Sequence, residues 1–202
     1  DLHPRHLSIV SRAALHWLSK LYATSEACHS IPSQVSLILF FTRPKPAGGR
    51  RIVANLPSFY RVYTRARVDM VRCWDAANTD DHFYAGEGKG SVDSVDDIAM
   101  EDTFANVNGC HTLAAIGDLA KCFEKLPHDS LLRRAIGANF PARILGVCLA
   151  MYRCFRVIQV GMAYSCPVVT NLGVAAGCTL ATFIARGYLL TEMWAFRMAG
   201  FG

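Results

Sequence analysis

A carboxylate stands within the stretch from His111 to His128, which reads HTLAAIGDLAKCFEKLPH. Small and apolar residues at 113–116 predict a short buried strand, and Asp118 follows where that strand ends. A carboxylate in this position is costly unless it meets a cation, a metal ion or hydrogen-bond donors. Ligands collect at the carboxyl ends of strands in open sheets, so Asp118 is a candidate metal ligand or catalytic group. The alternative interpretation of Asp118 by itself is a helix cap after a strand.

A second set of groups that could do chemistry is cationic. Residues 43–53 read RPKPAGGRRIV, in which prolines and paired glycines predict a hairpin tip with cations on both arms. From Arg43 to Arg72 the chain carries eight basic residues against the single acid Asp69, whereas residues 75–102 are predominantly acidic. Such a basic run suits a phosphate-rich partner, and the alternative is a solvated basic surface without a special role.

Small residues mark a third candidate stretch. Residues 173–183 read GVAAGCTLATF and lead into an apolar segment, Thr179–Met193, that predicts a buried helix. A loop without large side chains lets the backbone approach a base pair and its sugar closely. The alternative is a loop that does no more than precede the buried helix.

These stretches need scaffold elements, and the hydrophobic pattern predicts a helix-rich α+β fold. Helical spacing predicts helices over residues 7–22, 58–78, 130–138 and 141–152. Apolar runs predict strands over 35–41 and 155–160, the second followed by a hairpin at Gly161. His16 and Trp17 are expected in the core or at its boundary.

In this order along the chain, residues 45–61, 118–128 and 173–183 resemble motifs of the reverse transcriptases of non-LTR retroelements and group II introns. The DLAKCFEKLPH segment is similar to the first palm motif, Asp-Leu-x-Lys-Ala-Phe-Asp-x-Val-Pro-His. The segment at 173–183 is similar to the second palm motif, with Gly177 in place and Ala176 where the family has glutamine. The segment at 45–61 resembles the fingers motif.

The resemblance implies the fingers and partial palm of a right-hand polymerase, helix-rich with a small antiparallel sheet. It divides the chain into an N-terminal helical segment (1–34), a fingers-like region (35–110) and a partial palm (111–202). The implied activity is RNA-directed DNA polymerisation, with an RNA or DNA template, a primer and a dNTP as partners. The oligomeric state does not follow from the sequence.

In such an enzyme two Mg²⁺ ions about 4 Å apart assist the attack of the primer 3′-hydroxyl on the α-phosphate of the dNTP. The resemblance makes Asp118 the catalytic metal ligand and assigns Lys45 and Arg51 to the triphosphate. It sets Phe123 beneath the incoming sugar and Gly177 beside the base pair, although Phe123 has a plain core role as its alternative. The cations expected on the nucleic-acid backbone are Arg43, Arg50, Arg61 and Arg65.

The third palm motif, an Asp-Asp turn downstream of the second, does not occur within these 202 residues. The Asp-Asp pairs that do occur, Asp80-Asp81 and Asp96-Asp97, both precede Asp118. We therefore expect a fragment that does not polymerise by itself. The alternatives are a catalytically inactive, nucleic-acid-binding remnant of such a polymerase, and an unrelated interaction or membrane-proximal helical domain.

Composition favours a globular intracellular protein. A hydrophobic content of 52% with 18% charged residues argues against disorder. The eight cysteines form no CxxC pair, so we expect the nucleus or cytoplasm rather than secretion. No segment reaches the ~18 uncharged apolar residues of a membrane span, so no membrane partner is expected.

Overall fold

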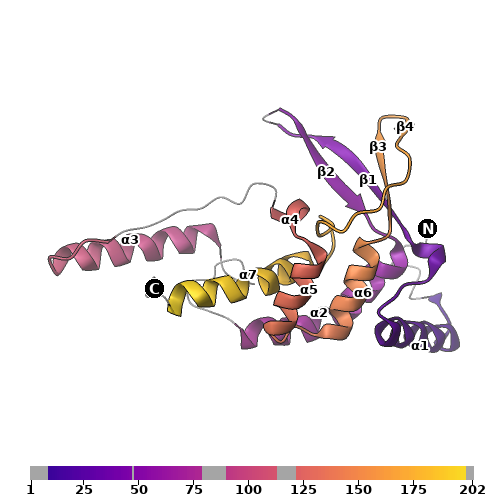
Figure 1. Cartoon of the computed structure of the whole chain (residues 1–202), viewed down its shortest axis with the longest axis horizontal. Helices are drawn as coiled ribbons and strands as arrows, with labels where there is room; N and C mark the ends of the chain where they lie inside the picture. Colours follow the sequence, from indigo (N-terminus) through magenta and orange to yellow (C-terminus); the bar gives the residue numbers. More distant parts are fainter. Residues whose placement is uncertain (1–8, 47, 79–89, 113–121, 199–202) are drawn as a thin grey trace. The chain divides into compact units, whose positions relative to one another are not determined.

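The computed structural model of the chain describes residues 9–46, 48–78, 90–112 and 122–198 (Figure 1). They belong to two compact units, one made of Asp1–Trp74 with Cys122–Gly202 and the other of Asp75–Lys121. The functional division at residues 34 and 110 stays a prediction, because the units are defined by packing alone.

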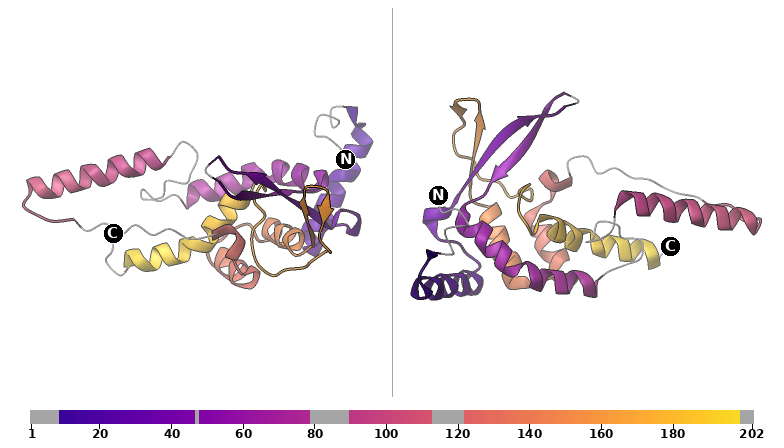
Figure 2. Two further views of the ribbon diagram at one scale, coloured as in Figure 1. Left: turned by 90° about the horizontal axis from the view of Figure 1, so that it is seen from above. Right: turned by 180° about the vertical axis from the view of Figure 1, so that it is seen from behind.

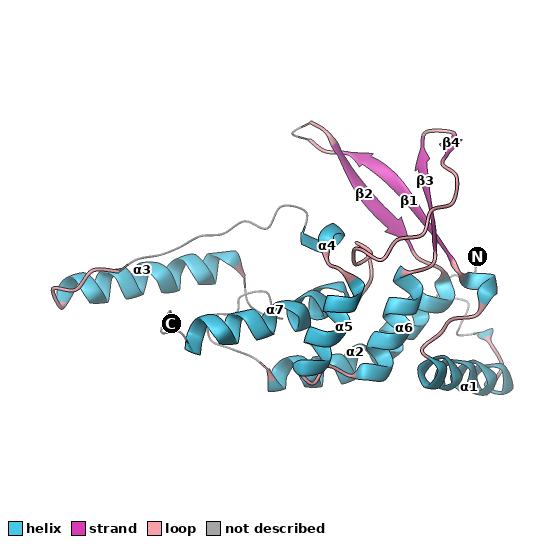
Figure 3. Ribbon diagram, viewed as in Figure 1, coloured by secondary structure: helices cyan, strands magenta, loops and turns pink. Residues whose placement is uncertain are grey.

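Four strands of the first unit form one small sheet (Figure 3). The strands are β1 (Leu37–Pro44), β2 (Arg50–Asn55), β3 (Phe155–Val160) and β4 (Ala163–Tyr164), in the order β2-β1-β3-β4. Neighbours β1 and β2 are antiparallel, as are β3 and β4, but β1 and β3 are parallel. The α+β class is therefore confirmed, whereas the expected antiparallel sheet is wrong. The central strands β1 and β3 are not joined by a hairpin, which would have made them antiparallel.

Helices make up most of the rest of the first unit, and three of them lie within two residues of their predicted ends. They are α1 (Arg12–Cys28), α2 (Ser58–Ala77), α4 (Cys122–Lys125), α5 (His128–Gly137), α6 (Ala142–Tyr152) and α7 (Ala181–Met198), with a short 3₁₀ turn at Ser33–Val35. The turns of the β1–β2 and β3–β4 hairpins extend away from α5 and α6 (Figures 1 and 2). None of the described helices is long and apolar enough to cross a bilayer.

The first helix differs from its prediction. It begins at Arg12 because the hydroxyl oxygen of Ser11 accepts a hydrogen bond from the amide of Ala14 at 3.2 Å. Its buried residues, Tyr22 and Ser25, both lie in the second half of the helix. Trp17 is 67% exposed, so the expectation that it belongs to the core or its boundary is wrong.

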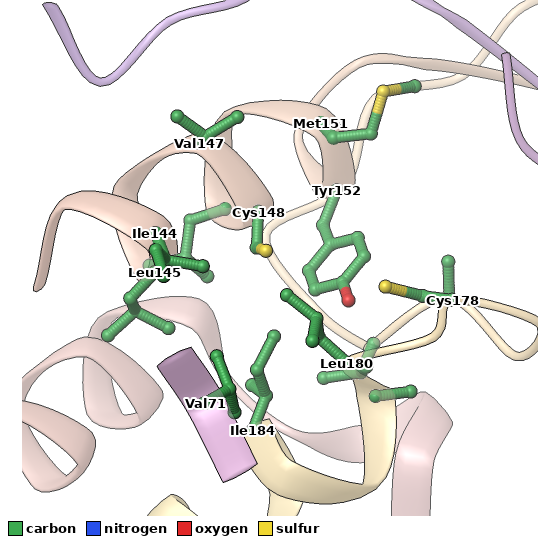
Figure 4. Close-up of a cluster of buried hydrophobic side chains, with 14 of the residues drawn as sticks. Val71, Ile144, Leu145, Val147, Cys148, Met151, Tyr152, Cys178, Leu180 and Ile184 are labelled. Carbon is green, nitrogen blue, oxygen red and sulfur yellow. The ribbon is translucent and has the colours of Figure 1, made fainter. Parts of the chain in front are cut away.

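The core of the first unit lies between α2, α6 and α7. Figure 4 shows its centre, where Val71, Leu145 and Ile184 point toward one another from these three helices. Trp74 closes one end, and its indole N–H donates to the carbonyl of Ala138 at 2.8 Å. This packing fixes α2 and α7, and with them the segments that precede each helix.

The second unit has one described helix, α3 (Ser91–Val107). The amide of Gly90 donates to the carboxylate of Asp93 at 2.6 Å, which orders the first turn. The predicted strand at residues 113–116 lies outside the described residues, as does Asp118.

Candidate nucleic-acid interface

The predicted basic hairpin is present as β1 and β2. The amide of Lys45 donates to the carbonyl of Gly49 at 3.0 Å, and the amide of Gly48 donates back to Lys45 at 3.1 Å. Gly48 and Gly49 have φ angles of 86° and 80°, in the left-handed region that favours glycine. The turn therefore holds the exposed Lys45 at the tip of two arms that carry arginines.

The arginines of this hairpin are held at defined places on it. The guanidinium of Arg50 donates to the hydroxyl of Thr42 at 2.9 Å, and that of Arg43 lies 5.4 Å from the centre of the Phe41 ring. Arg51 pairs with Arg43 in the strand register. The sequence-predicted cations Arg43, Lys45 and Arg50 thus share one exposed element.

A glycine loop, residues 173–178, is attached to the base of this hairpin. The amide of Ala54 in β2 donates to the carbonyl of Ala176 at 3.1 Å. Gly177 has a φ of 106°, and a Cβ there would lie 3.1 Å from the carbonyl oxygen of Ala54. The glycine is needed both for its backbone angle and for this close approach.

The same loop is attached to α2. The thiol of Cys178 is buried and lies 3.3 Å from the hydroxyl oxygen of Tyr60. Burial raises the pKa of Tyr60 well above its ordinary value, so this hydroxyl stays protonated near neutral pH. Gly177 is therefore fixed between β2 on one side and α2 on the other.

A pocket of about 550 Å³ lies where these elements meet. Its lining comes from the end of β2 and the start of α2 together with the glycine loop: Leu56, Arg61, Val62, Thr64, Arg65, Ala66, Gly177, Cys178 and Thr179. Arg61 and Arg65 are exposed and one helical turn apart, which sets both cations on the same side of α2. The structure thus brings together three predicted site residues, Arg61, Arg65 and Gly177.

Other cations of the basic run are engaged in ion pairs. The Nε of Arg67 lies 2.6 Å from a carboxylate oxygen of Glu26 in α1, and Arg72 pairs with Asp69 at 3.4 Å. The ion pair of Arg67 with Glu26 is partly buried, and the hydroxyl of Tyr63 also donates a hydrogen bond to the carboxylate of Glu26. The basic surface is consequently narrower than the count of charges between Arg43 and Arg72 predicts.

The residues that follow Asp118 are joined to the glycine loop by backbone hydrogen bonds. Val174 donates to the carbonyl of Phe123 at 2.7 Å, and Gly173 donates to that of Leu126 at 2.8 Å. A Cβ on Gly173 would lie 2.9 Å from the carbonyl oxygen of Glu124, and its φ is 85°. Two stretches that were predicted to share a site are therefore in contact.

His128 adds a side-chain link between the same two stretches. Its Nε2 lies 2.8 Å from the carbonyl oxygen of Gly173, and a carbonyl can only accept, so Nε2 carries the proton. The guanidinium of Arg156 also donates to the carbonyls of Leu172 and Gly173, at 3.1 and 3.4 Å. Sequence reasoning missed both residues as supports of the loop.

Folding stability should depend on His128 below neutral pH. The buried imidazole has Nδ1 without a partner among the described residues, and burial lowers the pKa of His128 despite its bond to Gly173. In the unfolded chain a histidine titrates near ~6.5, so below that pH the unfolded state binds a proton that the folded state resists. Stability attributable to His128 is thus present above this pH and is lost as the pH falls.

The measurement is urea unfolding at pH 7.5 and pH 5.5. One such group lowers the free energy of unfolding by at most about 1.4 kcal/mol per pH unit. His128→Gln, which keeps a donor for Gly173, should unfold with a smaller difference between the two pH values than the wild type. An equal pH dependence in both proteins would show that His128 titrates normally in the fold.

Of the two candidate residues Phe123 and Asp118, only Phe123 belongs to the described part of the chain. Phe123 is half-buried and packs against the hydrophobic core, a location that suits its core role and leaves its proposed contact with a sugar a prediction. Asp118 lies outside the described residues. Within the described part of the chain, no three His, Cys, Asp or Glu side chains come together as a metal site.

The pocket also contains polar residues that the sequence analysis did not select. Thr64 lies one turn beyond Arg61 on α2, and its hydroxyl donates to the carbonyl of Arg61 at 3.1 Å. Thr179 follows the glycine loop and is exposed. Helical spacing from Arg61 could have selected Thr64, but only the fold shows that Thr179 lies at the same pocket.

No protein-family model matches the chain, and no curated protein is significantly similar to it.

Proposed function

We propose that this chain binds nucleic acid as the fingers and partial palm of a reverse transcriptase of the non-LTR retroelement or group II intron type. The residues that contact the nucleic-acid backbone in this proposal are Arg43, Arg50, Arg61 and Arg65. Lys45 and Arg51 serve the triphosphate of an incoming dNTP, and Gly177 lets the backbone approach the base pair.

The pocket between α2 and the glycine loop is the observation that carries the proposal. It joins two sequence stretches, around residues 61 and 177, that resemble separate motifs of one polymerase family. An unrelated helical domain would not be expected to bring these stretches together around a pocket that two arginines line. Arginine offers a planar fork of donors that matches phosphate oxygens, which suits this pocket for a nucleotide or a strand.

A complete polymerase of this kind uses two Mg²⁺ ions as Lewis acids for nucleotidyl transfer. Asp118 would be one ligand of these ions. No Asp-Asp pair follows Asp118 within residues 119–202. The function proposed for the 202-residue chain is accordingly binding, with catalysis reserved for a protein that also contains the third motif.

The purified chain should therefore fail to extend a primer. Asp118 as the sole matching carboxylate cannot hold two Mg²⁺ ions in the geometry that phosphoryl transfer requires. The measurement is extension of oligo(dT) on poly(A) with dTTP and Mg²⁺, with an active reverse transcriptase as the positive control. Extension by the chain that is lost in Asp118→Asn would contradict the prediction and identify a complete active site.

Binding itself should depend strongly on salt and little on sequence. If about four phosphates are neutralised, the logarithm of the binding constant falls with the logarithm of salt concentration with a slope of about −3 to −4. Fluorescence anisotropy with two single-stranded oligonucleotides of unrelated sequence, between 50 and 300 mM KCl, measures the slope. A binding constant that does not change with salt would contradict an interface made of Arg43, Arg50, Arg61 and Arg65.

The alternative function is that of a catalytically inactive, nucleic-acid-binding remnant of such a polymerase. Ala176 favours it, because a methyl group replaces the glutamine of the motif, and the interaction that the structure gives Ala176 is the one of its backbone carbonyl with Ala54. The two candidates predict the same binding for this chain. They differ in whether coding sequence beyond residue 202 continues to an Asp-Asp turn or reaches a stop codon.

A further inference from the structure

The two faces of the sheet differ in what they contact. In the strand register Ile38 and Phe40 of β1 share a face with Ala54 of β2, and these residues are buried or pack against the core. The opposite face, called the open face below, carries the alternate residues of each strand. Its members include Leu37, Leu39, Phe41, Arg43, Val53, Phe155, Val157, Gln159 and Tyr164.

Aromatic rings are spread over the open face and are accessible. Phe41 lies opposite Gln159 in the parallel pair, and Gln159 lies opposite Tyr164, so one row crosses three strands. Phe155 lies at the other end of β3, opposite Leu37. Tyr164 is 62% exposed and Phe155 is 52% exposed, whereas Phe41 is half-buried.

Charge on the sheet has one sign. Arg43 lies over the ring of Phe41 on this face, and the chain segments 37–55 and 155–172 contain no Asp or Glu. Residues along a strand rise about 3.3 Å each and adjacent strands are about 4.8 Å apart, so Phe155 and Tyr164 are separated by roughly 14 Å. The surface therefore combines separated, accessible rings with cations and has no acids of its own.

We propose that the open face is a stacking platform for the bases of single-stranded nucleic acid, with Phe155 and Tyr164 as the stacking rings and Arg43 on a phosphate. Stacking on aromatic rings beside cations is the mode by which proteins hold single strands without reading their sequence. A duplex fits less well, because its bases already stack on one another and offer no free faces. An apolar protein surface would gain nothing from the cations.

This inference rests on the proposed nucleic-acid function and adds a second contact surface to it. The pocket at Arg61 and Arg65 is lined by α2 and the glycine loop, and the open face consists of other residues. Charge dominates the first surface and stacking the second. Protein variants and oligonucleotides that change only charge or only stacking therefore distinguish the two surfaces.

The first experiment removes rings from the protein. Phe155→Leu and Tyr164→Leu keep apolar bulk and lose the π-face, and each should weaken binding of a labelled single-stranded 12-mer by about tenfold. Tyr164→Phe should bind as the wild type does, because the ring is retained. Phe104→Leu on α3 is the matched control, since Phe104 is also exposed and is not part of the sheet.

The second experiment removes bases from the ligand. A 12-mer with abasic sites keeps every phosphate, so it should bind the wild type more weakly than the intact 12-mer. The same substitution should have little effect on the double variant Phe155→Leu/Tyr164→Leu. If that double variant does not fold, as judged by circular dichroism, Tyr164→Leu alone at the two-residue strand β4 gives the same comparison.

Four outcomes would overturn the inference. Equal binding of intact and abasic oligonucleotides by the wild type would leave charge as the only attraction. Binding unchanged in the leucine variants, but reduced by charge reversal at Arg61 and Arg65, would remove the open face and keep the proposed function. Leucine variants that alter the sedimentation of the free protein, with unchanged affinity, would make the face a contact between copies. No nucleic-acid binding by the wild type would reject both proposals.

Discussion

Gly173→Ala should destabilise the fold by about 3 kcal/mol, which is a large loss for the addition of a single methyl group. The φ of 85° places a non-glycine residue in the left-handed region, which costs roughly 1–3 kcal/mol. The new Cβ would also lie 2.9 Å from the carbonyl oxygen of Glu124, a backbone atom that cannot rotate away. Displacing that backbone loosens the bonds from Gly173 and Val174 to Leu126 and Phe123.

Gly161→Ala is the matched control for this change. Gly161 also has a left-handed φ, 61°, but a Cβ there meets nothing within 4 Å. Gly161→Ala should therefore lower the free energy of unfolding only by the cost of the left-handed backbone angle, about 1–2 kcal/mol. Chemical unfolding of the three proteins measures both losses. Equal destabilisation by the two substitutions would show that the contact between Gly173 and Glu124 does not constrain the native state.

The double charge reversal Arg61→Glu/Arg65→Glu should weaken binding of a single-stranded oligonucleotide by about a hundredfold at low salt. Each charge near a phosphate is worth about 1 kcal/mol at 4 Å in water, and reversal both removes an attraction and adds a repulsion. Screening reduces this sum, so the loss should shrink as salt rises. Both side chains are exposed, so the fold should be retained.

Arg143→Glu tests whether the position of the charge matters. Arg143 is an exposed arginine in α6 that does not line the pocket. It should change affinity by less than about threefold, through net charge alone. Anisotropy titrations at 50 mM KCl compare the variants, with thermal melting as the check on folding. A loss at Arg143 as large as that of the double variant would indicate a diffuse electrostatic attraction and no interface at α2.

Local sequence signals predicted local structure well. Paired glycines at 48 and 49 predicted the hairpin, because the left-handed angles that they adopt are steric requirements of that turn. Apolar spacing predicted α2 and α6 within one or two residues of their ends. The candidate residues Arg61 and Gly177 were selected from motifs and Arg65 from the basic run, and the fold brings all three to one pocket.

Nonlocal contacts account for what the sequence did not predict. The parallel pairing of β1 with β3 joins segments that are far apart in the chain. No short turn connects the two strands, so the local sequence does not indicate whether they pair parallel or antiparallel. The ion pair of Arg67 with Glu26 is equally invisible in the local pattern, so the basic run predicted more available charge than the fold offers. Trp17 has core-like spacing on α1, yet the packed side of that helix is set by Tyr22 and Ser25.

The parallel pairing of β1 with β3 also determines when the sheet can be completed during protein synthesis. The strand at residues 37–44 leaves the ribosome well before its inner partner at residues 155–160, because about 110 residues separate them in the sequence. Until then β1 and β2 form a two-stranded hairpin, which is marginally stable alone and carries an unpaired edge. Pairings of such long sequence separation form slowly. A nascent chain that stalls in this interval exposes a strand edge to other chains, so the risk of aggregation is greatest before residues 155–160 have been translated.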